Sequence, residues 1–587
     1  MDTFKTTSTR FCAIALLLPG LLSGHARAND GDIKESTLPP AKIIWISDST
    51  GTNIRNIETL LNPFSGQVSV NDAAKSAMLI STNGHKPSIL IDFGKEIYGS
   101  LKLYSGMHRN QKPKHVRICL GESVTEAMSN TDIPGNVQNP TNEHSLRDFE
   151  AAIPWLGSAE CGKSGFRFAR IDFIDANDTL PLRYVEARSF IRDIPDVGSF
   201  ECSDKRLNDI WNTGAYTVKL CMQDYVWDGI KRDRLVWLGD MHPEVMTAGT
   251  VWGELDVVKR SLDFAKDDTP LPGWINGMSA YSLWWLIIQR DMYMHTGNKS
   301  YLSEQVPYVK GLVDMLSTKI SDDGVEQLDG HRFLDWPSSE NAEAIHSGLQ
   351  SLTIMALNAA ADIGRWTSDK ELTANAEKQL AKMKSVNLPH NGNKQAAALS
   401  IISGQSKSPE ADAKALLDGG ANGFSTFYGY YMLEALARTG QVSEALDIIS
   451  DFWGSMLRLG ATTFWEDFDY ANADKASPID TFTPAGKYDI HADGGKYCYV
   501  GLRLSLCHGW ASGPTPWLTA NVLGIRPMEP GCATIEIAPD LGNLKWAKGS
   551  FPTPKGPVTV SVTRGSDGKA KAKVVAPKGI KIINRAK

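Results

Sequence analysis

The spacing of apolar residues changes twice along this chain of 587 residues, first near Ser199 and again past Pro516. Between these points apolar residues recur at helical spacing, and outside them they alternate with a period of two, which is typical of strands. A chain of this length has room for about three or four domains. We therefore predict an N-terminal β-sandwich domain at residues 29–197, a helical domain at 198–515 and a small C-terminal β-sandwich domain at 516–587.

The two β regions are indicated by short apolar stretches between turns that contain glycine. In the first region these stretches are 88–94, 99–104, 116–120 and 166–174, and in the last region they are 534–539 and 558–563. Alternation over so few residues predicts short strands that bury one face, as in a sandwich of two sheets.

The central region is a succession of helical patterns separated by Gly, Pro and Asn. After a first helix that starts near Ser203, the patterns cover residues 281–296, 301–316, 342–366, 370–385, 393–404, 424–439 and 442–459. The region has the length of roughly ten to twelve helices and shows no clear internal repeat, which favours a barrel of helical hairpins over a solenoid. In such a barrel, loops at one end of the inner helices bring together residues that are distant in sequence.

The first residues have the pattern of a secretory signal peptide. Basic residues precede an apolar run at 11–22, and the stretch Ala26-Arg-Ala28 fits the rule for cleavage after small residues. The run is too short to anchor the protein in a bilayer. We expect residues 1–28 to be removed and the mature protein to be exported to the periplasm or the extracellular space without membrane insertion; a retained anchor is the alternative.

Composition argues against several classes of partner. The net charge of −6 is mild for this length, so it indicates neither nucleic acid nor an anionic membrane surface. The seven cysteines after the predicted signal peptide are scattered and never in a CxxC spacing, so we expect no zinc site, and one or two disulfides remain open. We also expect no cofactor and no other metal, because the acidic pair Asp467 and Asp469 fits a solvated loop; calcium binding there is the alternative. Sixteen tryptophans is a high number, which suits both a packed core and a carbohydrate site.

The most heavily charged stretch of the helical region is 228–240. It contains the carboxylates of Asp228, Asp233 and Asp240, the cations of Lys231, Arg232 and Arg234, and the indole of Trp237. A site that cleaves sugars needs this mixture: carboxylates to move protons, an aromatic wall for the ring and cations that tune the acids. An ion-paired structural turn is the alternative.

Three further stretches contain groups that could take part in a reaction. Glu466 follows a tryptophan at the end of a helical pattern, where its carboxylate can lie at a cavity mouth; a helix-end ion pair is the alternative. His508 lies among Gly, Trp and Pro in a shaped loop, where a structural histidine is the alternative. Asp335 and Trp336 form an Asp-Trp pair in a loop between two helical patterns.

In order and kind, these stretches resemble the motifs of the α-L-rhamnosidases of glycoside hydrolase family 78. The stretch 231–240 looks like the acid-bearing motif of that family, Asp335-Trp336 like its subsite tryptophan, 462–466 like its general-base motif and 505–508 like its late histidine. The resemblance extends to 90–96 and 121–127 in the leading β region, and to 524–531 and 549–557 in the last one.

The resemblance implies an (α/α)6 barrel and hydrolysis with inversion at the anomeric carbon. In that reaction a carboxylic acid protonates the leaving oxygen, and a carboxylate opposite activates water. It implies Glu466 as the base. It implies a substrate-binding set in which acidic side chains and a histidine hold the sugar hydroxyls and aromatic side chains form a wall: Asp228, Arg232, Trp237, Asp240, Asp335, Trp336 and His508. Further candidates for the wall are Trp274, Trp284 and Trp285.

The acid departs from the pattern of the family. Relatives commonly have a Glu in an Arg-Asp-Glu-Arg string, whereas this chain has Arg232-Asp233-Arg234. Counting back seven residues from Asp240 gives Asp233, which would replace that Glu with one methylene less of reach. If the gap lies elsewhere, the string lacks its acid, and Glu244 is the nearest carboxylate that could replace it.

The resulting prediction is an exported, inverting exo-glycoside hydrolase that removes terminal α-L-rhamnose from a glycan or a glycoside. One alternative is another sugar or a lyase reaction on the same barrel, although a lyase needs a Tyr/His pair and cationic clamps that these stretches do not supply. The other is a non-catalytic glycan-binding relative that has lost its acid. The expected partner is the carbohydrate, and the sequence does not indicate an oligomeric state.

Overall fold

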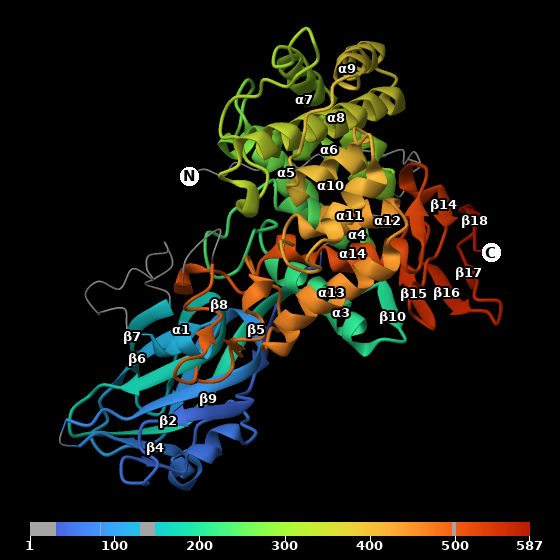
Figure 1. The fold of residues 1–587 in the computed structure, drawn as a ribbon. Coiled ribbons are helices and arrows are strands. Elements are labelled where there is room, and N and C mark those ends of the chain that lie inside the picture. The colour runs from blue at the N-terminus through green and yellow to red at the C-terminus, as the bar shows by residue number, and fades with distance from the viewer. Residues whose placement is uncertain (1–30, 83, 130–146, 496–500, 587) are drawn as a thin grey trace, which may run out of the picture.

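The computed structural model describes residues 31–82, 84–129, 147–495 and 501–586. Figure 1 shows an N-terminal sheet domain in blue and teal, a helical domain in green to orange, and a C-terminal sheet domain in red beside the helices. The predicted signal peptide lies outside the described residues. Among the residues that are described, no helix is both long and apolar enough to span a bilayer.

The N-terminal domain is built on a sheet whose nine described strands run in the order β3-β4-β9-β5-β8-β6-β7, with β1 paired to β9 and β2 to β5. The strands are β1 (Ile33–Leu38), β2 (Lys42–Ile46), β3 (Ile54–Arg55), β4 (Ala77–Ile80), β5 (Ser88–Ser105), β6 (Lys114–Gly121), β7 (Asp148–Ile153), β8 (Ser158–Phe173) and β9 (Thr179–Arg192), and helix α1 (Val124–Met128) follows β6. The expected alternation is present on β6, where Val116, Ile118 and Leu120 all enter the core of the domain. The prediction of a leading β domain is confirmed.

The central domain is helical, as the sequence predicts. Its helices are α3 (Lys205–Cys221), α4 (Met241–Val251), α5 (Asp256–Asp267), α6 (Ser279–Thr296), α7 (Lys299–Ser317), α8 (Ala342–Thr367), α9 (Lys370–Met383), α10 (Lys394–Ser403), α11 (Pro409–Leu417), α12 (Gly429–Arg438), α13 (Val442–Arg458) and α14 (Pro514–Asn521). The seven predicted segments after the first helix correspond to α6–α10, α12 and α13. The largest difference is at α12, which starts at Gly429 because residues 424–428 are not helical and end in a turn at 426–428.

Local sequence explains where these helices begin and which face they bury. Short polar side chains accept a backbone N–H bond at the first turns of α7, α8, α9 and α10: Asn298, Asn341, Asp369 and Asn393. Helix α10 ends at Ser403 and is followed by Gly404, whose left-handed conformation costs glycine little. From Ser279 to Gln289 every residue of α6 is buried, so α6 belongs to the interior of the domain.

The C-terminal domain consists of two small sheets in the described residues, β10-β15-β16-β17 and β13-β14-β18. Its strands are β13 (Ile525–Pro527), β14 (Thr534–Ile537), β15 (Trp546–Phe551), β16 (Val558–Arg564), β17 (Ala570–Val575) and β18 (Lys581–Asn584). The first sheet also includes β10 (Ser199–Cys202), which precedes the helices and pairs antiparallel with β15. Helix α14 crosses the boundary predicted at 515/516. Both ends of the helical region therefore meet in this domain.

Arg167 of β8 connects the N-terminal sheet to the helical domain. Its Nε and Nη2 donate to the two carboxylate oxygens of Asp92 at 2.8 and 2.9 Å, and its Nη1 donates to the carbonyl of Gly460 at 2.9 Å. Gly460 starts the long segment after α13, and in Figure 1 this orange segment reaches the N-terminal domain. There the backbone N–H of Val124 donates to the carbonyl of Ile479 at 2.8 Å.

We expect Arg167→Met to lower the free energy of unfolding by about 3–5 kcal/mol, because it leaves a buried carboxylate without its bidentate partner. The Asp92 side chain is only 1% exposed. Urea unfolding measures the loss. The control is Arg365→Met, which removes an arginine that is 51% exposed and pairs with Asp362 and Glu377. Exposed pairs contribute about 0–1 kcal/mol, so equal losses in the two variants would contradict the prediction.

Candidate active site

A cavity of ≈120 Å³ between the loop 228–240 and the start of α6 brings most of the predicted site residues together. Seven of the nine line it: Asp228, Asp233, Trp237, Asp240, Trp336, Glu466 and His508. The other two, Arg232 and Asp335, are buried behind this lining. A wider depression of ≈680 Å³ along α5 and α7 contains none of the nine.

The loop 228–235 is closed at its base by Asp228. The backbone N–H of Asp228 donates to the carbonyl of Leu235 at 3.1 Å, and the N–H of Leu235 donates to Asp228 Oδ1 at 2.9 Å. At the tip, Asp233 and Arg234 both adopt left-handed conformations, with φ of 56° and 53°. Such conformations are strained for residues other than glycine and are found at functional sites. The turn places the Asp233 carboxylate on the cavity wall, where it is 23% exposed.

One guanidinium contacts both predicted catalytic carboxylates. Arg232 Nη2 donates to Glu466 Oε1 at 2.5 Å, and Arg232 Nη1 lies 2.9 Å from Asp233 Oδ2. The Nε of Arg232 donates to the carbonyl of Arg503 at 3.1 Å, which fixes the plane of the group. Asp233 and Glu466 therefore lie at the two ends of one planar cation, and its width keeps them from direct contact.

Glu466 is an ionised carboxylate inside the cavity wall. Burial opposes its charge, but Arg232, His508 and a hydrogen bond from the Ser505 backbone outweigh burial and lower the pKa of Glu466 to about 2. The Ser505 N–H donates to Glu466 Oε2 at 3.0 Å. An ionised carboxylate held in this way can accept a proton from water.

The carboxylates of Asp228 and Asp240 have the opposite tendency. Burial raises the pKa of both, although His508 beside them favours their charged forms. His508 Nε2 lies 2.9 Å from Asp240 Oδ2, and the Tyr281 hydroxyl donates to Asp240 Oδ1 at 3.4 Å. Burial lowers the pKa of His508, but Glu466 and Asp240 outweigh it and raise that pKa. The cavity thus places proton carriers beside an ionised base.

Aromatic side chains line the rest of the cavity, and sequence reasoning missed several of them. The missed lining residues are Met278, Tyr281, His331, Phe333 and Trp510. Phe333 and Trp510 lie two residues from Asp335 and His508, so a wider reading of the two motifs would have found them. Met278 and His331 are joined by a backbone bridge, which only the fold reveals.

The three additional tryptophan candidates do not line the cavity. Trp284 and Trp285 are fully buried in the core of the helical domain, and Trp274 donates its indole N–H to Asp329 instead. For Trp284 and Trp285 the prediction is wrong because α6 turns their indole rings towards the packed interior, whereas Tyr281 at the start of the same helix faces the cavity.

Asp335 supports the wall rather than forming it. Its Oδ1 accepts the backbone N–H of Trp336 at 2.9 Å, and its Oδ2 accepts the hydroxyl of Ser425 at 2.5 Å. It caps the short 3₁₀ helix Trp336–Ser338 and so orients the Trp336 ring. Burial raises the pKa of Asp335 to about 7.

Glu244, the alternative acid, lies on α4 and is absent from the cavity lining. Its carboxyl packs so closely on Gly509 that a Cβ added there would overlap with Glu244 Oε1. Neither of its oxygens has a hydrogen-bond partner in the described structure, and burial raises its pKa well above the usual value. Glu244 can hold a proton, but the geometry favours Asp233 as the group that meets a ligand.

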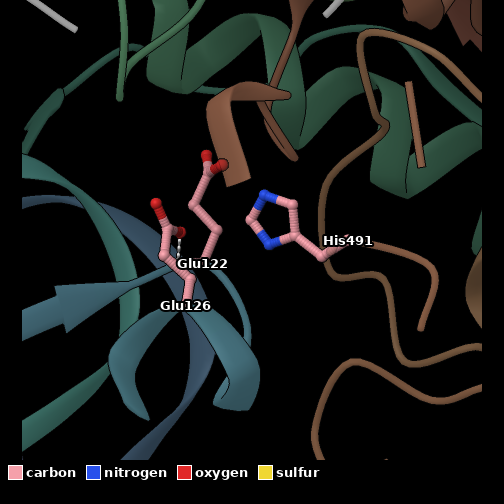
Figure 2. Close-up of side chains that lie close together, drawn as sticks. All are labelled: Glu122, Glu126 and His491. Carbon is pink, nitrogen blue, oxygen red and sulfur yellow. Dashed lines mark hydrogen bonds between the residues drawn. The ribbon is translucent and has the colours of Figure 1, made fainter. Parts of the chain in front are cut away.

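A group of buried side chains next to the site has the residue types of a metal site. Figure 2 shows Glu122 and Glu126 of the N-terminal domain near His491 of the segment after α13. Lys231 inserts its ammonium among them: Nζ lies 3.0 Å from Glu122 Oε2, 3.2 Å from Glu126 Oε1 and 3.4 Å from His491 Nε2. The lysine therefore occupies the position that a metal ion would take.

A small aromatic-walled cavity, in which an ionised carboxylate faces carboxyl groups of raised pKa, is the type of site that glycoside hydrolases use. Comparison with known proteins shows what the chain is similar to. Residues 195–391 match the bacterial α-L-rhamnosidase 6 hairpin glycosidase domain, and residues 524–583 match the bacterial α-L-rhamnosidase C-terminal domain. These two stretches of the chain thus resemble domains of bacterial α-L-rhamnosidases, and the resemblance to that family is confirmed.

Individual relatives agree with this family. An α-L-rhamnosidase of Alteromonas sp. (strain LOR) is 24% identical over 565 residues, which cover 87% of this chain and 57% of the relative. The chain thus spans little more than half the length of that relative. The GH78 family rhamnosidase of Bacillus sp. GL1 has a TM-score of 0.70 at 22% identity, over 90% of this chain and 55% of its own. The rhamnosidase from Klebsiella oxytoca with rhamnose bound has a TM-score of 0.64 at 21% identity, over 84% of this chain and 96% of its own.

We expect the contribution of Glu466 to stability to depend on pH. Its pKa is about 2 in the folded chain and 4.5 for the free side chain. The stabilisation is therefore complete above pH 4.5 and is lost as the pH falls towards 2. The difference in free energy of unfolding between the wild type and Glu466→Gln should shrink across this window, as measured by urea unfolding at a series of pH values. When both proteins also carry Arg232→Met, this difference in free energy of unfolding should vary less with pH. A difference between the wild type and Glu466→Gln that does not change with pH would contradict the lowered pKa of Glu466.

Proposed function

We propose that this chain hydrolyses terminal α-L-rhamnose from a glycan or a glycoside. The observation that carries the proposal is the position of Arg232, between Asp233 and Glu466 on the wall of a small cavity. The name of the Alteromonas relative and the rhamnose bound in the Klebsiella oxytoca structure support rhamnose as the sugar.

In the proposed reaction Glu466 is the general base and Asp233 the general acid. Glu466 takes a proton from a water molecule as that water attacks the anomeric carbon, and Asp233 gives its proton to the glycosidic oxygen. Arg232 keeps Glu466 charged and sets its distance from Asp233. The carboxylates of inverting glycosidases lie about 6.5–9.5 Å apart to leave room for the water. A guanidinium between the two carboxylates supports such a separation, and hence inversion.

The remaining residues hold the sugar. Asp228, Asp240 and His508 present polar atoms to the cavity and would bind rhamnose hydroxyls. Trp237 and Trp336 would contact the apolar face of the ring. Asp335 contributes indirectly, because it orients Trp336.

The size of the cavity supports exo cleavage. Its volume of ≈120 Å³ is small, since pockets for drug-sized ligands have about 300–1,000 Å³. A single terminal sugar residue is therefore the expected occupant. The match to the six-hairpin domain and the buried helix α6 support closure of the helices as an (α/α)6 barrel. The signal-peptide pattern at 1–28 supports export to the periplasm or the extracellular space.

We expect the wild type to release L-rhamnose from aryl α-L-rhamnosides, and Asp233→Asn and Glu466→Gln to lower kcat by about 10²–10⁴-fold, the usual contribution of a general acid or base. Leaving groups distinguish the two roles. The loss in Asp233→Asn should be larger for an alkyl rhamnoside than for a nitrophenyl one, which needs little protonation, whereas the loss in Glu466→Gln should be similar for both.

Glu244→Gln is the control for this experiment and should keep turnover. A leaving-group-dependent loss in Glu244→Gln, with full activity in Asp233→Asn, would assign the acid to Glu244. Binding of rhamnose by the wild type without turnover of any rhamnoside would favour the non-catalytic alternative.

We expect the first product to be the β-anomer of L-rhamnose. Inversion at the anomeric carbon of an α-linked substrate yields β, and mutarotation then produces the mixture. Proton NMR during the first turnovers distinguishes the anomers. Initial release of the α-anomer would overturn inversion without affecting the assignment of the sugar.

A further inference from the structure

A buried lysine joins the N-terminal sheet domain to the loops of the active site. Lys231 is fully buried, and its Nζ lies 3.0 Å from Glu122 Oε2 and 3.2 Å from Glu126 Oε1. The same ammonium donates to the carbonyls of Leu502 and Leu504 at 3.0 and 2.5 Å. The two glutamates belong to the N-terminal domain, and the two carbonyls belong to the segment that carries the site histidine.

Both oxygens of Glu466 are held by neighbours of this lysine and its partners. Arg232, the residue after Lys231, donates to Glu466 Oε1, and Ser505, the residue after Leu504, donates its N–H to Glu466 Oε2 at 3.0 Å. A displacement of Lys231 would therefore move both donors. Each donor to Glu466 is only one residue along the chain from Lys231 or from a carbonyl that Lys231 binds.

Glu122 also holds the second segment directly. Its Oε2 accepts the backbone N–H of Leu506 at 2.6 Å. His491 adds a neutral contact, because its Nε2–H donates to the Leu504 carbonyl at 2.9 Å while its Nδ1 accepts the Ser123 hydroxyl at 2.7 Å. Burial lowers the pKa of His491 to about 4, which keeps the ring uncharged.

The charges of this cluster balance without a metal ion. Lys231 faces Glu122 and Glu126, and Arg147 forms a second ion pair with Glu126. Ion pairs buried as deeply as these contribute little net stability compared with apolar packing, but removal of one partner is costly. A role in fixing geometry explains the cluster better than a role in stability alone.

We propose that the Lys231 ammonium, held by Glu122 and Glu126, acts as an internal cation that positions the general base Glu466. The N-terminal sheet domain supplies both glutamates and so helps to set the geometry of the active site. The proposal rests on the proposed function for the role of Glu466 as the base. Lys231 does not line the cavity, so it is a positioning residue and not a catalytic one.

Two variants test the proposal. Lys231→Met keeps the length of the side chain but removes its charge and its donors. Glu122→Met keeps the pair of Lys231 with Glu126 and removes the acceptor for Leu506, so it provides a second variant should Lys231→Met fail to fold. The matched control is Lys114→Met, which removes a buried lysine of the N-terminal domain.

The control separates stability from positioning. Lys114 Nζ pairs with Asp178 at 2.5 Å and also donates to Asn110, so both of its partners lie within the N-terminal domain. Lys114→Met should therefore lower the thermal stability of the protein and leave kcat unchanged.

We expect Lys231→Met to lower kcat on an aryl α-L-rhamnoside by on the order of 10²-fold, the cost of a misplaced catalytic group, with a much smaller change in KM. Glu122→Met should have a smaller effect in the same direction. In both variants the acid limb of the rate–pH profile should move to higher pH, because Glu466 loses donors that keep it ionised. Hydrogen exchange should increase in residues 228–235 and 502–508 and remain unchanged in α8.

Folded variants of Lys231 and Glu122 would overturn the proposal if their kcat, pH profile and exchange matched those of Lys114→Met. The exchange measurement does not depend on the substrate. If the wild type releases no rhamnose, the proposed function is wrong. Hydrogen exchange at residues 502–508 would still decide whether Lys231 holds this segment in place. Unchanged hydrogen exchange in Lys231→Met would also overturn the role of Lys231 in holding residues 502–508.

Discussion

A charged carboxylate buried in the wall of a small cavity is the constraint on which the rest of this structure depends. Burial alone would protonate Glu466, and in the proposed reaction a protonated Glu466 could not activate water. The Arg232 guanidinium and the Ser505 N–H offset burial, but both belong to loops rather than to helices or strands. The loops keep their geometry because the N-terminal sheet domain reaches them through the buried cluster around Lys231. A chain of contacts therefore links the N-terminal sheet domain to Glu466 in the helical domain.

The helices differ in how well the sequence predicts them. Segments with one exposed face, such as α9 and α13, have a clear period, and for α9 a capping aspartate marks the start. Helix α4 is buried on nearly every side, so it lacks the polar stripe that reveals a surface helix. The placement of β10 in the C-terminal sheet could not be predicted either, because its pairing joins Ser199 to Ser550, 351 residues later.

The charged part of the site was predictable, and the apolar part was not. Asp228, Asp233 and Asp240 stand out because carboxylates are costly inside an apolar helical region and need a reason to be there. Tyr281 carries no such signal, since its local sequence is that of any buried helix, and only the orientation of α6 decides which aromatic ring meets the cavity. The left-handed turn at Asp233 is equally invisible in sequence, because no glycine or asparagine marks it.

The pairing of β10 with β15 determines the order in which the molecule can be completed. During synthesis β10 emerges ahead of every helix of the central domain, yet its hydrogen-bonding edge has no partner until β15 has been made. An unpaired strand edge is a site for mispairing and aggregation. A nascent chain that folds its helices early thus carries an open strand edge just before α3, and β15 covers that edge only after the whole helical domain has been made. The C-terminal sheets thus cover this strand edge, and none of their residues lines the cavity of the candidate active site.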